Sequence, residues 1–237
     1  MDVAELILRK TLPVVINSFN QPSYLKNIVK KFIHNEFMNI YIVDQNSNTN
    51  NILELYKNYE LSKEATVLYL GHNSGPRYFF ESRIYEKYFK NIPLIFTDPD
   101  LDFDDLDPNF VTKLFNLSRK YKVAKVGPAL QIPELHEMAL NTIQHPENPE
   151  IECTIAEWES QFWTNSLEQD VYGAGIDTTL HFFNPEYFAD MSSFYKAIRV
   201  SSPGIIIKHL PWYINNPLCT SEEKEFYIAN KTYGWWS

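Results

Sequence analysis

Cysteine is scarce in this sequence, and positive charge is outnumbered by negative charge. Only two cysteines, Cys153 and Cys219, occur among 237 residues, and they lie far apart. This spacing disfavours a disulfide scaffold or a paired-cysteine metal site and is typical of a reduced cytoplasmic protein. Lysine and arginine number 21 against 30 aspartates and glutamates, which gives a net charge of −9. A protein of this charge is not expected to bind a nucleic-acid backbone.

Long apolar runs are also missing. No stretch is apolar for long enough to cross a bilayer, and the N-terminal stretch MDVAELILRKTLP has acids near its start and does not resemble a signal peptide. Hydrophobic residues make up 44% of the chain and aromatic residues 15%. These values are those of a water-soluble globular chain that is long enough for one large domain with a substantial core.

The first half of the sequence alternates short β-rich runs with helical patterns. Strands that alternate with helices predict βαβ units, so we expect an α/β fold with a mostly parallel central sheet flanked by helices. The predicted strands are residues 13–18, 39–44, 65–71 and 92–97, and the predicted helices are residues 22–34, 51–59, 78–89 and 107–121.

The alternation stops beyond residue 125. The second half is expected to be irregular and to shape a second pocket. No repeat, low-complexity tract or linker divides the two halves, which predicts a single domain over residues 1–237 with halves of about 1–125 and 126–237. In the second half we expect helices at 154–167 and 221–233, strands at 171–176, 178–184 and 204–210, and a loop at 145–150.

Small polar residues follow all four predicted strands of the first half. Ligands of open parallel α/β sheets bind at the carboxyl ends of the strands, so four polar ends on one edge predict a binding site there. A single such end could be turn chemistry, because Asn, Asp, Ser and Gly are common in turns. The polar stretches are residues 17–21, 44–47, 71–77 and 98–100.

The fourth strand ends in three alternating aspartates, in the sequence LIFTDPDLDF at 94–103. A calcium loop of the EF-hand type needs Gly and Glu where this chain has Phe103 and Asn109, so that interpretation fails. A phosphatase of the haloacid dehalogenase type would use Asp98 as its nucleophile, and this remains an alternative. The third interpretation is a DxD motif that holds a divalent cation on the diphosphate of a sugar nucleotide.

The order of the segments PVVINSFNQ, YIVDQNS, GHNSGPR, TDPD and KHLPWY resembles a GT-A-type glycosyltransferase. It is similar to the bacterial family-2-like enzymes that build surface polysaccharides, and the resemblance spans about residues 13–213. It implies a single GT-A (Rossmann-like) domain in which residues 1–125 bind the nucleotide sugar and residues 126–237 bind the acceptor.

The resemblance also implies roles for residues at the strand ends. The end of the first strand would line the base and ribose, Asp44 would accept a hydrogen bond from uracil, and Arg77 would contact the diphosphate. The donor-binding residues implied in this way are Asn17, Ser18, Phe19, Asp44, Asn73, Gly75, Arg77 and Asp98. Apart from the resemblance, Trp212 is expected to stack on a sugar ring, because the apolar face of a pyranose packs on indole.

The metal ligands implied by the resemblance are Asp98, Asp100 and His209. The imidazole favours Mn²⁺ over Mg²⁺, although either ion could serve. The catalytic base is expected to be Asp177, or else Glu159. Enzymes of this kind often carry a Glu-Asp pair for the base, and this sequence has none in a suitable place.

The expected activity is therefore metal-dependent transfer of a sugar, with inversion, from a UDP-sugar to the hydroxyl of a glycan or a lipid-linked acceptor. A lipid-linked acceptor would bring this cytoplasmic enzyme to the membrane surface. A binding protein without turnover is a further alternative. A nucleotidyltransferase is disfavoured because no glycine-rich, arginine-containing loop follows the first strand.

Overall fold

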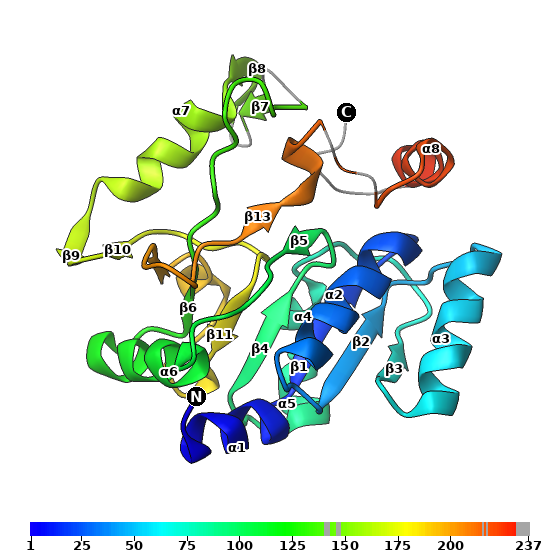
Figure 1. Ribbon diagram of the computed structural model, residues 1–237, viewed down its shortest axis with the longest axis horizontal. Helices are drawn as coiled ribbons and strands as arrows, with labels where there is room; N and C mark the ends of the chain where they lie inside the picture. The colour runs from blue at the N-terminus through cyan, green and yellow to red at the C-terminus, as the bar shows by residue number, and fades with distance from the viewer. Residues whose placement is uncertain (140–142, 146–147, 215, 217, 231–237) are drawn as a thin grey trace.

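The computed structural model describes residues 1–139, 143–145, 148–214, 216 and 218–230, and a nine-stranded sheet is its central feature (Figure 1). In order across the sheet, its strands are β3 (Thr66–Tyr69), β2 (Ile40–Asp44), β1 (Val14–Ser18), β4 (Leu94–Thr97), β11 (His181–Phe183), β6 (Lys125–Pro128), β12 (Ala197–Val200), β10 (Val171–Gly173) and β9 (Ser166–Glu168).

The sheet is mixed, so the expectation of a mostly parallel sheet was wrong. The pairs β3–β2, β2–β1, β1–β4 and β6–β12 are parallel, whereas β4–β11, β11–β6, β12–β10 and β10–β9 are antiparallel. Two of the antiparallel pairs arise from β11, which comes from the second half of the chain and inserts in the opposite direction between β4 and β6. The other two arise from β10, which is antiparallel to both of its neighbours. The second half is therefore less irregular than expected, because it supplies five strands to the same sheet.

Helices cover both faces of the sheet. Alternation along β1 sends Val14 and Ile16 to one face and Val15 to the other, as the period of a strand requires. The helices α2, α3 and α6 pack on the first face, and α4 and α5 pack on the second (Figure 1). The helices are α1 (Val3–Thr11), α2 (Pro22–His34), α3 (Asn50–Ser62), α4 (Tyr78–Glu81), α5 (Ile84–Phe89), α6 (Phe110–Tyr121), α7 (Ile155–Ser160) and α8 (Ser221–Asn230).

Two short antiparallel sheets lie outside the large one. The first pairs β5 (Leu101–Asp102) with β13 (Lys208–His209), and the second pairs β7 (Ile143–His145) with β8 (Asn148–Cys153). Single-turn 3₁₀ helices are η1 (Gln161–Trp163), η2 (Pro185–Tyr187), η3 (Met191–Ser193) and η4 (Leu210–Trp212).

Several predicted elements differ from those observed. The helix expected at 78–89 is two short helices, because Arg83 adopts a left-handed conformation (φ 56°) between them. The helix expected at 154–167 ends at Ser160 and continues only as η1. Of the strand expected at 204–210, only β13 is a strand. Part of the predicted loop at 145–150 belongs to β7 and β8, and residues 146–147 lie outside the described residues.

The N-terminal helix α1 was not predicted, and two buried charges fix it to the molecule. Glu5 accepts hydrogen bonds from the backbone nitrogens of Val111 and Thr112, both at 2.9 Å. These are nitrogens in the first turn of α6, where a helix has unpaired N–H groups and favours negative charge. Arg9 lies one turn further along α1 and donates to Glu5 at 2.8 Å, which balances the buried carboxylate.

Candidate functional site

Three strand ends are tied together by one glutamine. Gln45, directly after β2, donates to the side chain of Asn17 at the end of β1 (3.0 Å) and to the backbone oxygen of Gly75 (2.9 Å). Its side-chain oxygen accepts from the backbone nitrogen of Ser74 at 3.2 Å. The polar stretches after β1, β2 and β3 therefore meet at one edge of the sheet, as the sequence predicted, although Gln45 itself was not among the expected site residues.

Asp98 joins the same edge from the end of β4. One of its carboxylate oxygens accepts a hydrogen bond of 2.6 Å from the Thr178 hydroxyl, and the other lies 3.5 Å from the side-chain nitrogen of Asn17. Burial, followed by the nearby Asp100 carboxylate, raises the pKa of Asp98 well above its usual range. Thr178 is thus a site residue that was not predicted.

Asp100 and His209 are brought together by the β5–β13 pair. This short ladder places His209 opposite Leu101, the residue that follows Asp100. The side chains of His209 and Asp100 therefore face one another, with 3.4 Å between His209 Nε2 and Asp100 Oδ2. Asp100 Oδ1 and His209 Nδ1 are buried, and neither has a hydrogen-bond partner in the described part of the chain. Buried polar atoms are normally paired, so two unpartnered ones on neighbouring side chains suggest that a ligand belongs there.

The third aspartate, Asp102, is directed elsewhere. Its carboxylate accepts from the side chain of Asn27 at 3.1 Å and lies 3.4 Å from the Lys31 ammonium, both on α2. The charge of Asp102 is therefore compensated by Lys31. Of the three alternating aspartates, only Asp98 and Asp100 lie at the candidate site.

The expected metal ligands are only partly assembled. Asp100 and His209 lie together, but Asp98 is engaged with Thr178 and Asn17, and the described residues contain no group of three His, Cys, Asp or Glu side chains suited to holding a metal ion. The carboxylate oxygen of Asp100 and the imidazole nitrogen of His209, which lack partners within the described ranges, nevertheless fit a divalent cation with mixed oxygen and nitrogen ligands. They could supply two ligands, and a bound diphosphate could supply others.

Asp44 is placed at the end of β2 but uses its carboxylate internally. It accepts from the backbone nitrogen of Ser47 at 3.1 Å and from the Tyr56 hydroxyl at 2.8 Å. Ser18 also contacts the Tyr56 hydroxyl, at 3.0 Å. Asp44 and Ser18, two predicted donor-binding residues, thus belong to a buried network centred on Tyr56.

This network predicts a measurable pH dependence of stability. Burial, followed by the Asp44 charge, raises the pKa of Tyr56. An unfolded tyrosine loses its proton near pH 10, so the folded state binds the extra proton above that pH, and the free energy of unfolding falls as the pH rises beyond about 10. Tyr56→Phe should cost about 1.5–3 kcal/mol at neutral pH, the usual value for a hydrogen bond to a charged group.

Tyr56→Phe should also lose stability less steeply above pH 10 than the native protein does. Urea unfolding monitored between pH 7 and 11 would measure both effects. Tyr88→Phe is the control, because Tyr88 is exposed on α5. Equal alkaline slopes for Tyr56→Phe and the native chain would contradict this account of the network.

Arg77 and Asp177, predicted as a diphosphate ligand and a base, bind one another. Arg77 Nε and Nη2 lie 2.9 and 2.7 Å from the two oxygens of Asp177, which is a bidentate pair. The Arg77 guanidinium also lies 5.1 Å from the centre of the Tyr195 ring. Both partners remain partly exposed, with 42% and 37% of their side-chain surfaces accessible, so a ligand can reach them.

The loop before Arg77 is shaped by Asn73 and Gly75. The side chain of Asn73 accepts from the backbone nitrogen of Gly75 at 3.1 Å. Gly75 has a φ of +91°, which only glycine adopts without strain, so it is Gly75 that allows the turn leading to Arg77.

Two of the predicted residues are buried in structural contacts. Glu159 forms a 2.8 Å ion pair with Arg199 and is 1% exposed. Trp212 is packed in the core with its ring centre 4.7 Å from that of His209. Neither side chain presents an open surface to a ligand, although Trp212 supports the imidazole of His209.

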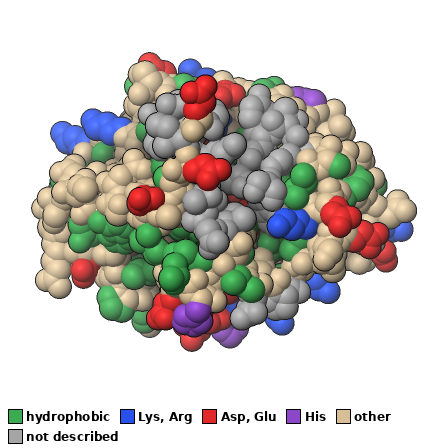
Figure 2. Space-filling view, turned by 90° about the horizontal axis from the view of Figure 1, so that it is seen from above, with side chains coloured by type: hydrophobic (Ala, Val, Ile, Leu, Met, Phe, Trp, Pro, Cys, Tyr) green, Lys and Arg blue, Asp and Glu red, His purple; other side chains and the backbone are tan. Residues whose placement is uncertain are grey.

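Helix α8 corresponds to the helix predicted at 221–233, of which residues 231–233 lie outside the described residues. Its position at the carboxyl edge of the sheet was not predicted. Tyr227 of α8 is close to Phe19, with ring centres 6.2 Å apart, and Glu223 accepts from Ser23 at the start of α2 (2.9 Å). Viewed from above, acidic side chains are spread over this face next to residues that are not described (Figure 2). Phe19 and Tyr227 therefore form an aromatic pair just after the end of β1.

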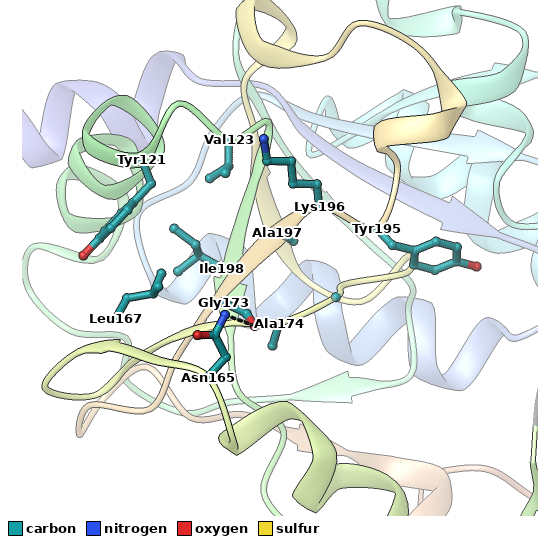
Figure 3. A pocket seen from close by; sticks show the side chains of 11 residues that line it. Tyr121, Val123, Asn165, Leu167, Gly173, Ala174, Tyr195, Lys196, Ala197 and Ile198 are labelled. Atoms are coloured by element: carbon teal, nitrogen blue, oxygen red, sulfur yellow. Dashed lines mark hydrogen bonds between the residues drawn. The ribbon is translucent and has the colours of Figure 1, made fainter.

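A separate hollow of about 340 Å³ lies at the opposite edge, near the amino ends of β6 and β12. Tyr121, Leu167, Gly173 and Ile198 line it, and Tyr195 lies at its margin and points away from the others (Figure 3). Its position separates it from Asp98 and Asp100, so the candidate site does not coincide with this hollow.

Comparisons with known proteins give similarity only to solved structures. The sequence matches no protein-family model and no curated protein. The mannosyltransferase PcManGT from Pyrobaculum calidifontis, solved with GDP-Man and Mn²⁺, has a TM-score of 0.49 at 10% identity. GalNAc-T7, solved with UDP, GalNAc and Mn²⁺, has a TM-score of 0.47 at 15% identity, and a UDP-glucose pyrophosphorylase has 0.43 at 10%.

The shared lengths differ between these structures. The alignments cover 93% of this chain but 60% of the mannosyltransferase, and 92% of this chain but 47% of GalNAc-T7. For the pyrophosphorylase they cover 81% of this chain and 90% of that one. Identities and scores at this level do not establish a shared family or a shared activity.

No helix among the described residues is long and apolar enough to span a membrane.

Proposed function

We propose that this chain is a metal-dependent glycosyltransferase that moves a sugar from a nucleotide-diphosphate sugar to the hydroxyl of a glycan or lipid-linked acceptor. One observation carries the proposal: Asp100 and His209 present buried ligand atoms, without partners among the described residues, at the edge where the four strand ends meet. Ligands of such sheets bind where polar strand ends meet, and the negative charge of the aspartates beside these ends favours a bound cation.

In this proposal Asp100 and His209 hold Mn²⁺ or Mg²⁺, which would neutralise charge on the leaving diphosphate when bound. Asp98 lies next to Asp100 and is fixed by Thr178 and Asn17, so it would face the ribose or a water molecule of the metal. Asn17 and Phe19 would line the base and ribose from the end of β1.

Arg77 and Asp177 would act as a coupled pair. In the absence of a ligand, the guanidinium and the carboxylate satisfy one another. A diphosphate would compete for Arg77, because guanidinium binds phosphate oxygens as readily as carboxylate oxygens. Release of Arg77 would then leave the Asp177 carboxylate free to accept the proton of the acceptor hydroxyl, as inversion requires.

The first test is a thermal-shift panel of UDP, GDP, CDP and dTDP, each with and without Mn²⁺. A ligand that binds only the folded state raises the unfolding midpoint according to its affinity. We expect a shift for one nucleotide that depends on Mn²⁺, and UDP is the first choice. All four bases belong in the panel, because Asp44, the expected uracil ligand, uses its oxygens internally.

Turnover separates the proposed enzyme from the alternatives. Slow release of nucleoside diphosphate from the matching sugar nucleotide would support a transferase, whereas binding without release would indicate a binding protein. A folded protein that is stabilised by no nucleotide but cleaves phosphoesters, and loses that activity in Asp98→Asn, would be a phosphatase and would overturn the proposal.

A further inference from the structure

The loop 174–180, between β10 and β11, is held in place by hydrogen bonds from buried basic side chains to its backbone oxygens. The backbone oxygen of Gly175 accepts from Arg199 Nε at 2.9 Å. Lys125 Nζ donates to the backbone oxygens of Ile176 and Asp177, at 2.6 and 3.1 Å. Residues 174–180 belong to no strand of the described chain. Side chains therefore supply the hydrogen bonds to these backbone oxygens that a neighbouring strand would otherwise supply.

Lys125 is an unusual residue to find at this position. It is the first residue of β6, is 0% exposed, and forms no ion pair with a carboxylate in the described part of the chain. Its Nζ lies 3.3 Å from the centre of the Phe194 ring. Burial lowers the pKa of Lys125 well below its usual range, which shows how costly its position is.

His181 supports the same loop one position beyond it. It is 0% exposed, and its Nδ1 lies 2.6 Å from the backbone oxygen of Thr179. An oxygen at that distance requires Nδ1 to carry the proton, so Nε2 holds the lone pair and has no partner in the described structure. The Phe80 ring stacks beside the imidazole, with 5.8 Å between ring centres, and holds its orientation.

The supported loop carries two side chains of the candidate site. Thr178 donates to Asp98 at 2.6 Å, and the backbone oxygens of its two neighbours, Asp177 and Thr179, contact Lys125 and His181. Asp177, whose backbone oxygen accepts from Lys125, forms the bidentate pair with Arg77. A shift of the loop would therefore move the partners of both Asp98 and Arg77.

We propose that Lys125 and His181 are positioning residues that hold the loop 174–180 in place as a clamp, so that Thr178 fixes Asp98 and Asp177 stays beside Arg77 where the metal–nucleotide ligand binds. The clamp touches neither ligand nor metal and acts only through the loop. The expected effect on nucleotide binding rests on the proposed function. The expected ordering of the loop 174–180 by Lys125 and His181 does not.

Lys125→Met tests the clamp, because it keeps most of the side-chain volume and removes the donor. The probe is Mn²⁺ with whichever of UDP, GDP, CDP or dTDP gives the largest Mn²⁺-dependent thermal shift. We expect calorimetry to show about 10- to 100-fold weaker binding, the usual cost of losing a partner that orients a metal-site ligand. The matched control is Lys113→Met. Lys113 lies on α6 and donates to the Ser202 hydroxyl at 2.6 Å, so its loss should leave the affinity for the Mn²⁺–nucleotide probe unchanged.

His181 gives a second, independent pair of variants if Lys125→Met does not fold. Asparagine can place a side-chain nitrogen near the position of Nδ1, whereas leucine cannot, so His181→Asn should retain affinity that His181→Leu loses. Hydrogen exchange of the amides in residues 176–180 should be faster in Lys125→Met and His181→Leu than in the native chain. The exchange rates of the amides in the strands of the large sheet should be unchanged.

The outcomes distinguish the clamp from the proposed function. Native affinity in a folded Lys125→Met protein, or an equal loss in Lys113→Met, would overturn the clamp while leaving the function intact. If the native chain binds none of the four nucleotides, the proposed function fails, and hydrogen exchange decides the loop part alone: faster exchange supports the clamp and unchanged exchange overturns it.

Discussion

Replacing Asp100 by asparagine is expected to abolish Mn²⁺-dependent nucleotide binding and to lower sugar transfer or donor hydrolysis by at least about 100-fold. Asparagine keeps the size of the side chain but removes the charge that the cation requires. Asp100 Oδ1 is buried and has no hydrogen-bond partner among the residues that the structure describes, so the substitution breaks no described hydrogen bond at that atom. The folded state should therefore be no less stable, and relief of repulsion with Asp98 could raise its stability. Calorimetric titration with Mn²⁺ and nucleotide, together with thermal unfolding, measures both effects.

Asp102→Asn is the matched control for Asp100→Asn. It removes the same charge two residues away, but Asp102 pairs with Lys31 and Asn27 and not with His209. Because this ion pair is partly exposed, its loss should cost no more than about 1 kcal/mol and leave nucleotide affinity unchanged. If both variants weakened binding equally, the effect would be general electrostatic attraction, and the assignment of Asp100 as a metal ligand would be wrong.

The first half of the fold was predictable because its signals are local. The apolar runs that became β1, β2 and β4 are each bounded by polar residues, and α2 begins at Pro22, a favoured first helical position. The mixed sheet was not predictable from such signals. β11 has only three residues, and nothing in HFF indicates that it inserts between β4 and β6, more than fifty residues before it in the chain.

The candidate site divides in the same way. Asn17, Asp98 and Asp100 could be placed at one edge because they lie at or just after the carboxyl ends of strands, and parallel strands end together. The partner of each could not be foreseen. Thr178 meets Asp98 across 80 residues, and Asp177 meets Arg77 across 100, through a loop whose course depends on Lys125. Lysine at the start of an apolar strand gives no local sign that it will be fully buried.

The clearest disagreement between the predicted role of a residue and its surroundings concerns Glu159. Glu159→Gln should lower the free energy of unfolding by about 3–5 kcal/mol, because it leaves the buried Arg199 guanidinium without a counter-charge. Arg199 also lies 3.8 Å from the centre of the Phe162 ring and donates to Gly175, so it cannot turn outward without breaking both contacts. Urea unfolding at pH 7 measures the loss. Sugar transfer or donor hydrolysis per folded molecule should be unchanged at a temperature well below the unfolding midpoint.

Glu157→Gln provides the comparison within the same helix. Glu157 is exposed and completes the capping box of α7 by accepting from Thr154, and glutamine can still accept that bond, so this change should cost less than about 1 kcal/mol. The opposite pattern for Glu159→Gln, a stable protein with its rate per folded molecule reduced at least 100-fold, would make Glu159 the base after all. In that case Arg199 would have to release it when substrate binds, and the 174–180 loop, which Arg199 also holds, would move in the same step.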